Sequence, residues 1–238
     1  MMTRFGELIG DRPVHLIGAG SLSSKYAPTL TVKGVRTIHV WDDDVVEARN
    51  LYNQRFLPEH IGMPKVEAVA DYCRRLKPDG QTTFVLHREK LVAGTPLSGI
   101  VLAGVDSMKS RGVTWSCVRN NPAVSFFADG RVAMEGGKAF GLNPNNPEHV
   151  YRYEHEPHWH PDPENMQHGA CKTEFPRPEM SDIVAAHVLV RLSEWLDLEQ
   201  GRADPYLNFY AFCFVPRYCE ATEYWDLDDE QGADESDD

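Results

Sequence analysis

The chain has 238 residues, of which 42% are hydrophobic and 25% are charged. This composition is typical of a globular protein with a real core, and it excludes a disordered chain. The formal charge is −12, but eight acidic residues lie among the last thirteen, so the rest of the chain is only mildly acidic. No basic run is present that could neutralise phosphates along a duplex, so we expect no nucleic-acid partner.

The N-terminal residues and the cysteines indicate in which cellular compartment the protein is expected. The residues before Pro13 contain no apolar run long enough for a signal peptide, and no stretch approaches the roughly 20 apolar residues of a membrane span. The five cysteines form no CxxC pair and are odd in number, which argues against a disulfide framework. We therefore expect a cytoplasmic protein with free thiols and no membrane contact.

The first half of the chain alternates short apolar strands with amphipathic helices, which is the pattern of a parallel sheet covered by helices. The continuous apolar run at 100–105 is typical of a parallel strand buried on both faces. Pro64 is well placed at a helix start, because apolar residues then recur at helical spacing. The other expected strands are 14–17, 37–41 and 82–86, and the first helix is expected at 21–33.

The second half changes character. Strands at 123–127 and 131–142 are expected to form an antiparallel hairpin through Asp129 and Gly130. Residues 143–179 are rich in Pro, Asn and His, and we expect them to form a polar crossover without a core element. A helix over 181–198 and an aromatic strand over 206–215 are expected to follow.

These elements predict an α/β fold. We expect a Rossmann-like open sheet, parallel in its N-terminal half with helices on both faces, and with antiparallel strands and the long polar crossover in its C-terminal half. One domain is expected over 1–219, followed by an acidic tail at 220–238 that is expected to be disordered.

A glycine turn follows the first expected strand. Gly18, Gly20 and Ser21 lie between that strand and a helix, and Asp42 ends the next strand. Such glycines let the backbone approach a phosphate, and the carboxylate can accept the ribose hydroxyls, so we predict a nucleotide site. Ser23 replaces the third glycine of the usual fingerprint, so the pattern suits NAD as well as ATP. A glycine turn that only packs strand against helix is the alternative.

Several stretches together resemble the ThiF/MoeB family, whose adenylating core is shared with ubiquitin-activating enzymes. The resemblance covers residues 13–140 closely and 170–198 loosely. The matching stretches are the acidic strand end at 40–46, the Asn50-Leu51 and Gln54 box, the segment 61–68, the Asp106-Ser107 pair after the fourth strand, and Met134-Glu135-Gly136.

The resemblance implies ATP- and Mg²⁺-dependent adenylation of a carboxylate, typically the C-terminal glycine of a ubiquitin-like or sulfur-carrier protein or another peptide. Carboxylate attack on the α-phosphate brings two anions together, so the site needs cations and a metal. Asp106 is the expected magnesium ligand, and Lys65 would neutralise the triphosphate. Asp106 as a helix cap and Lys65 as a solvated first-turn residue are the alternatives. Further contacts are assigned to Asp42 (ribose), Asp44 (pocket wall), Asn50 and Gln54 (hydrogen-bond donors).

The chain departs from the family pattern at two places. Asn53 stands where the family box has arginine, and we expect Arg55 to take over that contact as a catalytic residue. The N-terminal helix whose arginine reaches a neighbouring subunit in many members is expected to be absent or short. A homodimer is nevertheless expected.

A cysteine and several histidines fall in the polar crossover. Cys171 lies loosely where family members carry a thiol that receives the activated partner, and an ordinary loop thiol is the alternative. Zinc is not expected, because the two CxxC pairs of zinc-binding members are missing. The histidines are His149, His155, His158, His160 and His168.

Two other functions stay open at this point. A nicotinamide-dependent oxidoreductase would explain the glycine turn and Asp42, but not Gln54 or Lys65. A non-catalytic scaffold that binds nucleotide and a ubiquitin-like partner would explain the missing arginine at Asn53.

Overall fold

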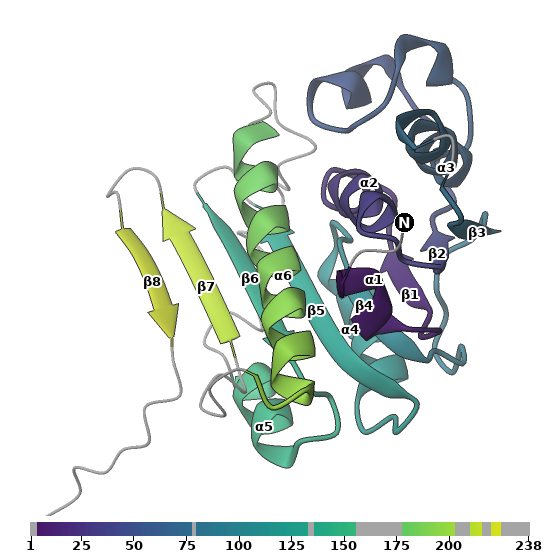
Figure 1. Cartoon of the computed structure of the whole chain (residues 1–238). Helices are drawn as coiled ribbons and strands as arrows, with labels where there is room; N and C mark the ends of the chain where they lie inside the picture. Colours follow the sequence, from purple (N-terminus) through teal and green to yellow (C-terminus); the bar gives the residue numbers. More distant parts are fainter. Residues whose placement is uncertain are drawn as a thin grey trace, which may run out of the picture.

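The structure is a computed structural model of the chain, and it describes residues 4–77, 80–132, 136–155, 178–202, 210–215 and 220–224. The described residues form one 8-stranded sheet in the order β3-β2-β1-β4-β5-β6-β7-β8 (Figure 1). The strands are β1 (Val14–Ile17), β2 (Thr37–Trp41), β3 (Thr83–His87), β4 (Gly99–Ala103), β5 (Val124–Val132), β6 (Gly137–Leu142), β7 (Tyr210–Val215) and β8 (Glu220–Tyr224). The helices are α1 (Arg4–Ile9), α2 (Ser23–Val32), α3 (Lys65–Leu76), α4 (Met108–Val118), α5 (Pro147–His155) and α6 (Pro178–Glu199), with 3-10 turns η1 (Ala48–Tyr52) and η2 (Pro58–His60).

Strand pairing divides the sheet into two halves. The strands from β3 to β5 pair in parallel, and those from β5 to β8 pair antiparallel. The predicted Rossmann-like open sheet, with its parallel first half and antiparallel second half, is therefore confirmed. Every residue of β1 and β4 is buried, as expected for central parallel strands that are covered on both faces.

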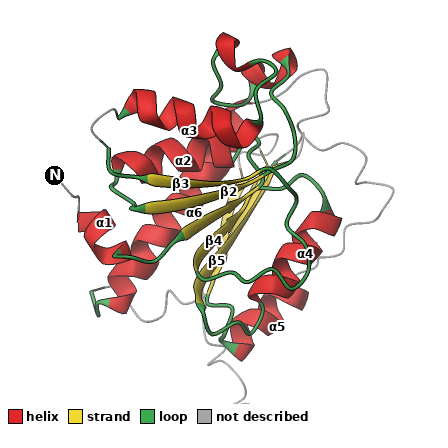
Figure 2. Cartoon of the chain, turned by 90° about the vertical axis from the view of Figure 1, so that its right-hand side faces the viewer, coloured by secondary structure: helices red, strands yellow, loops and turns green. Residues whose placement is uncertain are grey.

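Helices cover both faces of this sheet. Helices α1, α2, α3 and α6 lie on one face, and α4 and α5 lie on the other (Figure 2). Successive strand residues point to opposite faces, so Leu16 joins one apolar core and the adjacent Ile17 joins the other. The sheet is thus buried between two cores, which fixes the loops at its ends relative to one another. Among the described residues, no helix combines the length and the apolar character that a bilayer crossing requires.

The antiparallel hairpin differs from the prediction. Strand β5 continues through Asp129 and Gly130, and Val132 pairs with Gly137, so the chain reverses beyond Val132 and not at the Asp-Gly pair. The glycine serves packing, because a Cβ at Gly130 would lie 2.5 Å from the Tyr26 hydroxyl. Gly130, which the sequence suggested was part of a turn, instead allows β5 to lie close to α2.

Asp129 is a buried charge centre. Its carboxylate is fully buried and accepts hydrogen bonds from Arg111, from Arg131 Nε at 2.7 Å and from the Tyr153 hydroxyl at 3.0 Å. Burial, together with the nearby charge of Arg131, lowers the pKa of the Arg111 guanidinium. These partners come from α4, β5 and α5, so residues that are distant in sequence hold this aspartate inside a strand.

The polar crossover and the ends of the chain also differ from expectation. Helix α5 lies within 143–179 and buries Val150 and Tyr153, with Asn146 Oδ1 accepting from the Glu148 N–H at 2.9 Å. Helix α6 already begins at Pro178, before the predicted start. Strand β8 pairs with β7, so the sheet extends into the segment 220–238 that was expected to be a tail. The rest of that segment lies outside the described residues. Helix α1 spans 6 residues, Arg4–Ile9, and the residues before it lie outside the described part of the chain, so the expectation for the N-terminal helix stays a prediction.

Removing the charge of Asp129 should destabilise the protein strongly. Asp129→Asn keeps the side-chain volume but removes the counter-ion of the buried Arg111 and the half-buried Arg131, which typically costs about 3–5 kcal/mol in the free energy of unfolding. Urea unfolding measures the change. The control is Asp11→Asn, which breaks an exposed pair with Arg36 and should leave the midpoint unchanged. If Asp129→Asn unfolds at the wild-type urea concentration, the carboxylate is not the counter-ion of this cluster.

Candidate nucleotide site

The glycine turn joins β1 to α2. Gly18 has φ +86°, a conformation that side chains other than glycine rarely adopt, and its N–H donates to Trp41 O at 2.8 Å. A Cβ at Gly18 would lie 3.3 Å from Gly104 O, so the turn after β1 packs against the turn after β4. A Cβ at Gly20 would meet no atom within 4 Å. The backbone at Gly20 is therefore open to a ligand beside the N-terminus of α2.

The carboxylate of Asp42 ties this turn to the end of β2. Its Oδ2 accepts the Ala19 N–H at 2.6 Å, and its Oδ1 accepts the Asp44 N–H at 2.8 Å. Burial raises the pKa of Asp42, while the amide of Ala19 and the charge of Lys65 oppose that rise. Asp42 thus lies beside the glycine turn, where the sequence predicted a ribose ligand.

Lys65 is buried at the same edge of the sheet. The residue is 8% exposed, and its Nζ lies 2.7 Å from Asp44 Oδ2, while its backbone N–H donates to Asp44 O at 2.9 Å. The hydrogen bond from Lys65 holds the pKa of Asp44 below its usual value. The alternative of a solvated first-turn lysine is therefore wrong: α3, which starts directly after Pro64, delivers its first side chain into the site.

Asp106 follows β4, the strand next to β1. The cap of α4 is Ser107, whose Oγ accepts the Ser110 N–H at 3.2 Å, so Asp106 is not the helix cap. Its side chain is exposed. Strands β2, β1 and β4 are adjacent and parallel, so Asp42, the glycine turn and Asp106 lie at the same edge of the sheet, on both sides of the point where strand order reverses. Ligands of open α/β sheets bind at such a point.

The Asn50–Gln54 box lies in and after η1. Asn50 Oδ1 accepts the Glu47 N–H at 2.9 Å, so this amide shapes the turn itself. Gln54 is 8% exposed, and its Oε1 has no hydrogen-bond partner among the described residues. Since an unsatisfied buried acceptor is costly, Gln54 Oε1 is suited to accept from a ligand N–H or O–H, whereas the resemblance implied a donor at this residue.

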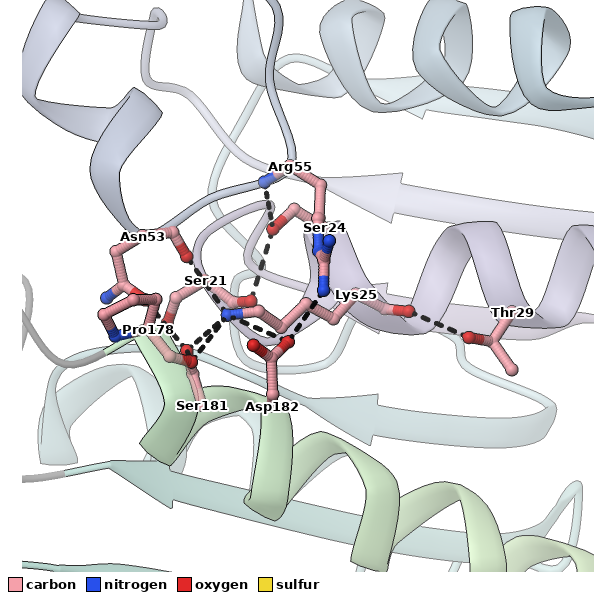
Figure 3. Close-up of polar contacts among 9 residues, drawn as sticks. All are labelled: Ser21, Ser24, Lys25, Thr29, Asn53, Arg55, Pro178, Ser181 and Asp182. Carbon is pink, nitrogen blue, oxygen red and sulfur yellow. Dashed lines mark hydrogen bonds and ion pairs between the residues drawn. The ribbon is translucent and has the colours of Figure 1, made fainter.

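Arg55 points toward α6. Its Nη2 lies 3.0 Å from Asp182 Oδ1 (Figure 3). Together with Lys25, both side chains line a cavity of about 240 Å³ between α2, α3 and α6. The cation that reaches Asn53 is Lys25, whose Nζ donates to Asn53 O at 3.2 Å. Sequence patterns singled out neither Lys25 nor Asp182. For Lys25, a signal was present in the sequence. The available signal was a lysine in the first turn of a helix, where the macrodipole disfavours positive charge.

Four predicted residues lie outside the described residues, so their predictions stay untested: Cys171, His158, His160 and His168. His149 is buried in α5 and accepts the Asn143 N–H at 3.2 Å. In the described part of the chain, the acidic, histidine and cysteine side chains close enough to share a metal ion are the following neighbours at the end of β2: Asp42, Asp43 and Asp44.

The sequence is similar to known adenylating proteins. Residues 6–157 match the model of the ThiF family. The sulfur carrier protein ThiS adenylyltransferase of Escherichia coli is 32% identical over 148 residues, which cover 60% of this chain and 57% of that protein. The SAMP-activating enzyme E1 of Haloferax volcanii is 40% identical over 113 residues, covering 44% of this chain and 40% of that protein.

Further relatives share the match over a shorter part of their length. Ubiquitin-like modifier-activating enzyme 5 of Drosophila virilis is 30% identical over 131 residues, covering 48% of this chain and 33% of the fly protein. The chain thus spans about a third of the length of this relative.

Solved structures share the fold. A crystal structure of PaaA has a TM-score of 0.68 at 14% identity, covering 94% of this chain and 67% of that one. Escherichia coli MccB with ATP also has a TM-score of 0.68, at 13% identity, covering 93% of this chain and 65% of that one. Because the family match at residues 6–157 extends over more than half of the sequence, the chain belongs to the ThiF family.

Proposed function

We propose that the chain uses ATP and Mg²⁺ to adenylate a carboxylate, and that this carboxylate is the C-terminal glycine of a ubiquitin-like or sulfur-carrier protein. The observation that carries the proposal is the burial of Lys65 at the carboxyl edge of the sheet, held by Asp44 beside the glycine turn. A buried ammonium at this place suits a polyphosphate. A hydride transfer would leave the buried ammonium of Lys65 without a role. Membership of the ThiF family also favours an adenylating enzyme over a dehydrogenase. The relatives whose names describe adenylation or activation support the substrate class.

The chemistry gives each group a task. The partner carboxylate attacks the α-phosphorus, the bond to the β-phosphate breaks, and pyrophosphate leaves. The amides of the glycine turn bind phosphate oxygens, and Asp42 holds the ribose. Lys65 offsets the repulsion between the two reacting anions, while Asp44 fixes the position of its ammonium.

The donor chemistry at Asp106 fits magnesium. Its exposed carboxylate supplies an oxygen ligand, which this ion prefers, and phosphate oxygens complete such sites. Bound magnesium would neutralise the charge that develops on the leaving pyrophosphate. The protein itself holds the Asp106 segment in place, because Arg111 donates a hydrogen bond to Val105 O.

Lys65→Met should abolish most of the activity. With a small partner protein ending in Gly-Gly, we expect the wild type to catalyse ATP–pyrophosphate exchange, and Lys65→Met to lower the rate by roughly 10²–10³-fold, as for loss of a preorganised electrostatic contact. The control is Lys90→Met, since Lys90 pairs with the neighbouring Asp43 at 3.4 Å and should be dispensable. Equal rates for wild type and Lys65→Met would contradict the proposal. ATP binding by the wild type without any exchange would instead support the scaffold that Asn53 suggests.

Asp106→Asn should weaken magnesium use selectively. We expect a large rise in the Mg²⁺ concentration needed for half-maximal exchange, because an amide is a poorer ligand than a carboxylate. The melting temperature should not change, since the side chain is exposed. Asp43→Asn is the matched control from the acidic group at the end of β2. If Asp43→Asn raises the Mg²⁺ requirement and Asp106→Asn does not, the ligand assignment is wrong.

A second step would follow at Cys171, which lies outside the described residues, so this step rests on the sequence resemblance. The thiolate attacks the acyl carbon, a thioester forms, and AMP leaves. Cys171→Ala should keep pyrophosphate exchange but lose the thiol-sensitive adduct of protein and partner on a non-reducing gel. An adduct that survives Cys171→Ala would exclude this cysteine as the acceptor.

A further inference from the structure

A buried tyrosine of α5 is connected to the turn that carries Asp106. Tyr153 is fully buried, and its hydroxyl donates to Asp129 Oδ2 at 3.0 Å. Burial raises the pKa of Tyr153 to about 12, so the hydroxyl keeps its proton and donates at neutral pH. Asp129 lies in β5, and its other carboxylate oxygen accepts from Arg111 of α4. A hydroxyl, a carboxylate and a guanidinium from three elements thus form one buried network.

Arg111 extends this network to the end of β4. Its Nη1 donates to Asp129 and also to Gly130 O at 3.0 Å, while its Nη2 donates to Val105 O. Burial is the main cause that lowers the pKa of Arg111, and the charge of Asp106 opposes that shift. The guanidinium therefore fixes the residue before Asp106 relative to β5, and it also interacts with the Asp106 carboxylate.

The backbone on both sides of Asp106 is held by α4. Val105 O accepts from Arg111 on one side. On the other side, Ser107 caps the helix, because its Oγ accepts the Ser110 N–H at 3.2 Å. The exposed carboxylate of Asp106 thus lies on a short segment with two anchors. Since Mg²⁺ demands near-ideal octahedral geometry, an anchor on the neighbouring backbone can set metal affinity without touching the ion.

Apolar packing alone does not require the Tyr153 hydroxyl. The ring packs between α4 and the sheet, with its centroid 4.6 Å from that of Trp115 and 5.4 Å from that of Phe140. Helices α4 and α5 lie side by side on this face (Figure 2). A phenylalanine would make the same ring contacts, and a buried ion pair adds little net stability over apolar residues of similar shape. The hydroxyl therefore serves the orientation of Asp129.

We propose that Tyr153 is a positioning residue for the binding of magnesium at Asp106. It acts through the buried pair of Asp129 and Arg111: the hydroxyl fixes the carboxylate, the carboxylate fixes the guanidinium, and the guanidinium fixes the carbonyl that precedes Asp106. The inference rests on the proposed function and deepens it, because it names a residue remote from the nucleotide that sets the metal affinity of the same site.

The test compares two affinities of the whole chain for ATP, one in Mg²⁺ and one in EDTA, measured by titration calorimetry without a carboxylate substrate. The wild type should bind ATP more tightly in Mg²⁺. Tyr153→Phe should raise the dissociation constant in Mg²⁺ by roughly fivefold and leave the value in EDTA unchanged, since partners bonded directly to a metal ligand typically cost about 10–100-fold. The matched control is Tyr151→Phe on the same helix, which is 62% exposed and should change neither value.

Two further variants test the route of this effect. In the background of Asp106→Asn, Tyr153→Phe should cause no further change in the dissociation constant measured in Mg²⁺, because the two residues act on one ligand. Arg111→Lys keeps the charge but loses the fork that reaches both Asp129 and Val105 O. It should reproduce the selective loss in Mg²⁺, and it decides the question if Tyr153→Phe does not fold.

The other outcomes separate the two proposals. If Tyr153→Phe weakens ATP binding equally in Mg²⁺ and in EDTA, or in neither, the tyrosine has only a structural role and the inference is overturned while the proposed function stands. An effect of Tyr153→Phe that persists in Asp106→Asn overturns it as well. A folded wild type that binds ATP in neither condition would overturn the proposed function, and this inference with it.

Discussion

The carboxylate of Asp42 is the interaction on which the candidate site depends. It accepts one amide from the glycine turn and another from the loop after β2, so these two loops share one anchor. The anchor is charged and largely removed from water, which raises its pKa, and Lys65 provides the opposing charge. The candidate nucleotide site thus already contains a largely buried carboxylate beside a buried ammonium. The glycine turn is anchored by this charged side chain as well as by the packing of Gly18 against Gly104.

The sheet determines where these charges meet. Parallel strands end at a common edge, so residues from the ends of β1, β2 and β4 become neighbours although they are far apart in sequence. Helix α3 contributes Lys65 from its first turn, because the backbone of Lys65 is bonded to Asp44. The two apolar cores fix the strands from either side. Small shifts of a strand would therefore separate the charges.

Sequence patterns predicted the parallel half of the fold and the edge where the site lies, since apolar runs followed by Gly18, Asp42 or Asp106 are local signals. They did not predict elements decided by distant contacts. The Asp-Gly pair at 129–130 is a turn signal, yet Arg111 and Tyr153 hold this aspartate within β5. The partners of Lys25 lie in segments far from it in sequence, which no local pattern shows. The crossover was predicted to lack a core element because its polar residues obscure the few apolar positions that anchor α5.

The hydrogen bonds from Lys25 Nζ to Asn53 O, Pro178 O and Ser181 Oγ have a consequence for the order in which the chain folds during synthesis. The glycine turn and the box lie in the first quarter of the sequence, but Pro178 and Ser181 emerge from the ribosome much later. Until α6 docks, the ammonium lacks two of its acceptors, and burying it would be unfavourable. The parallel strands can therefore form before α6 docks, while the enclosure of Lys25 is completed only once α6 is in place.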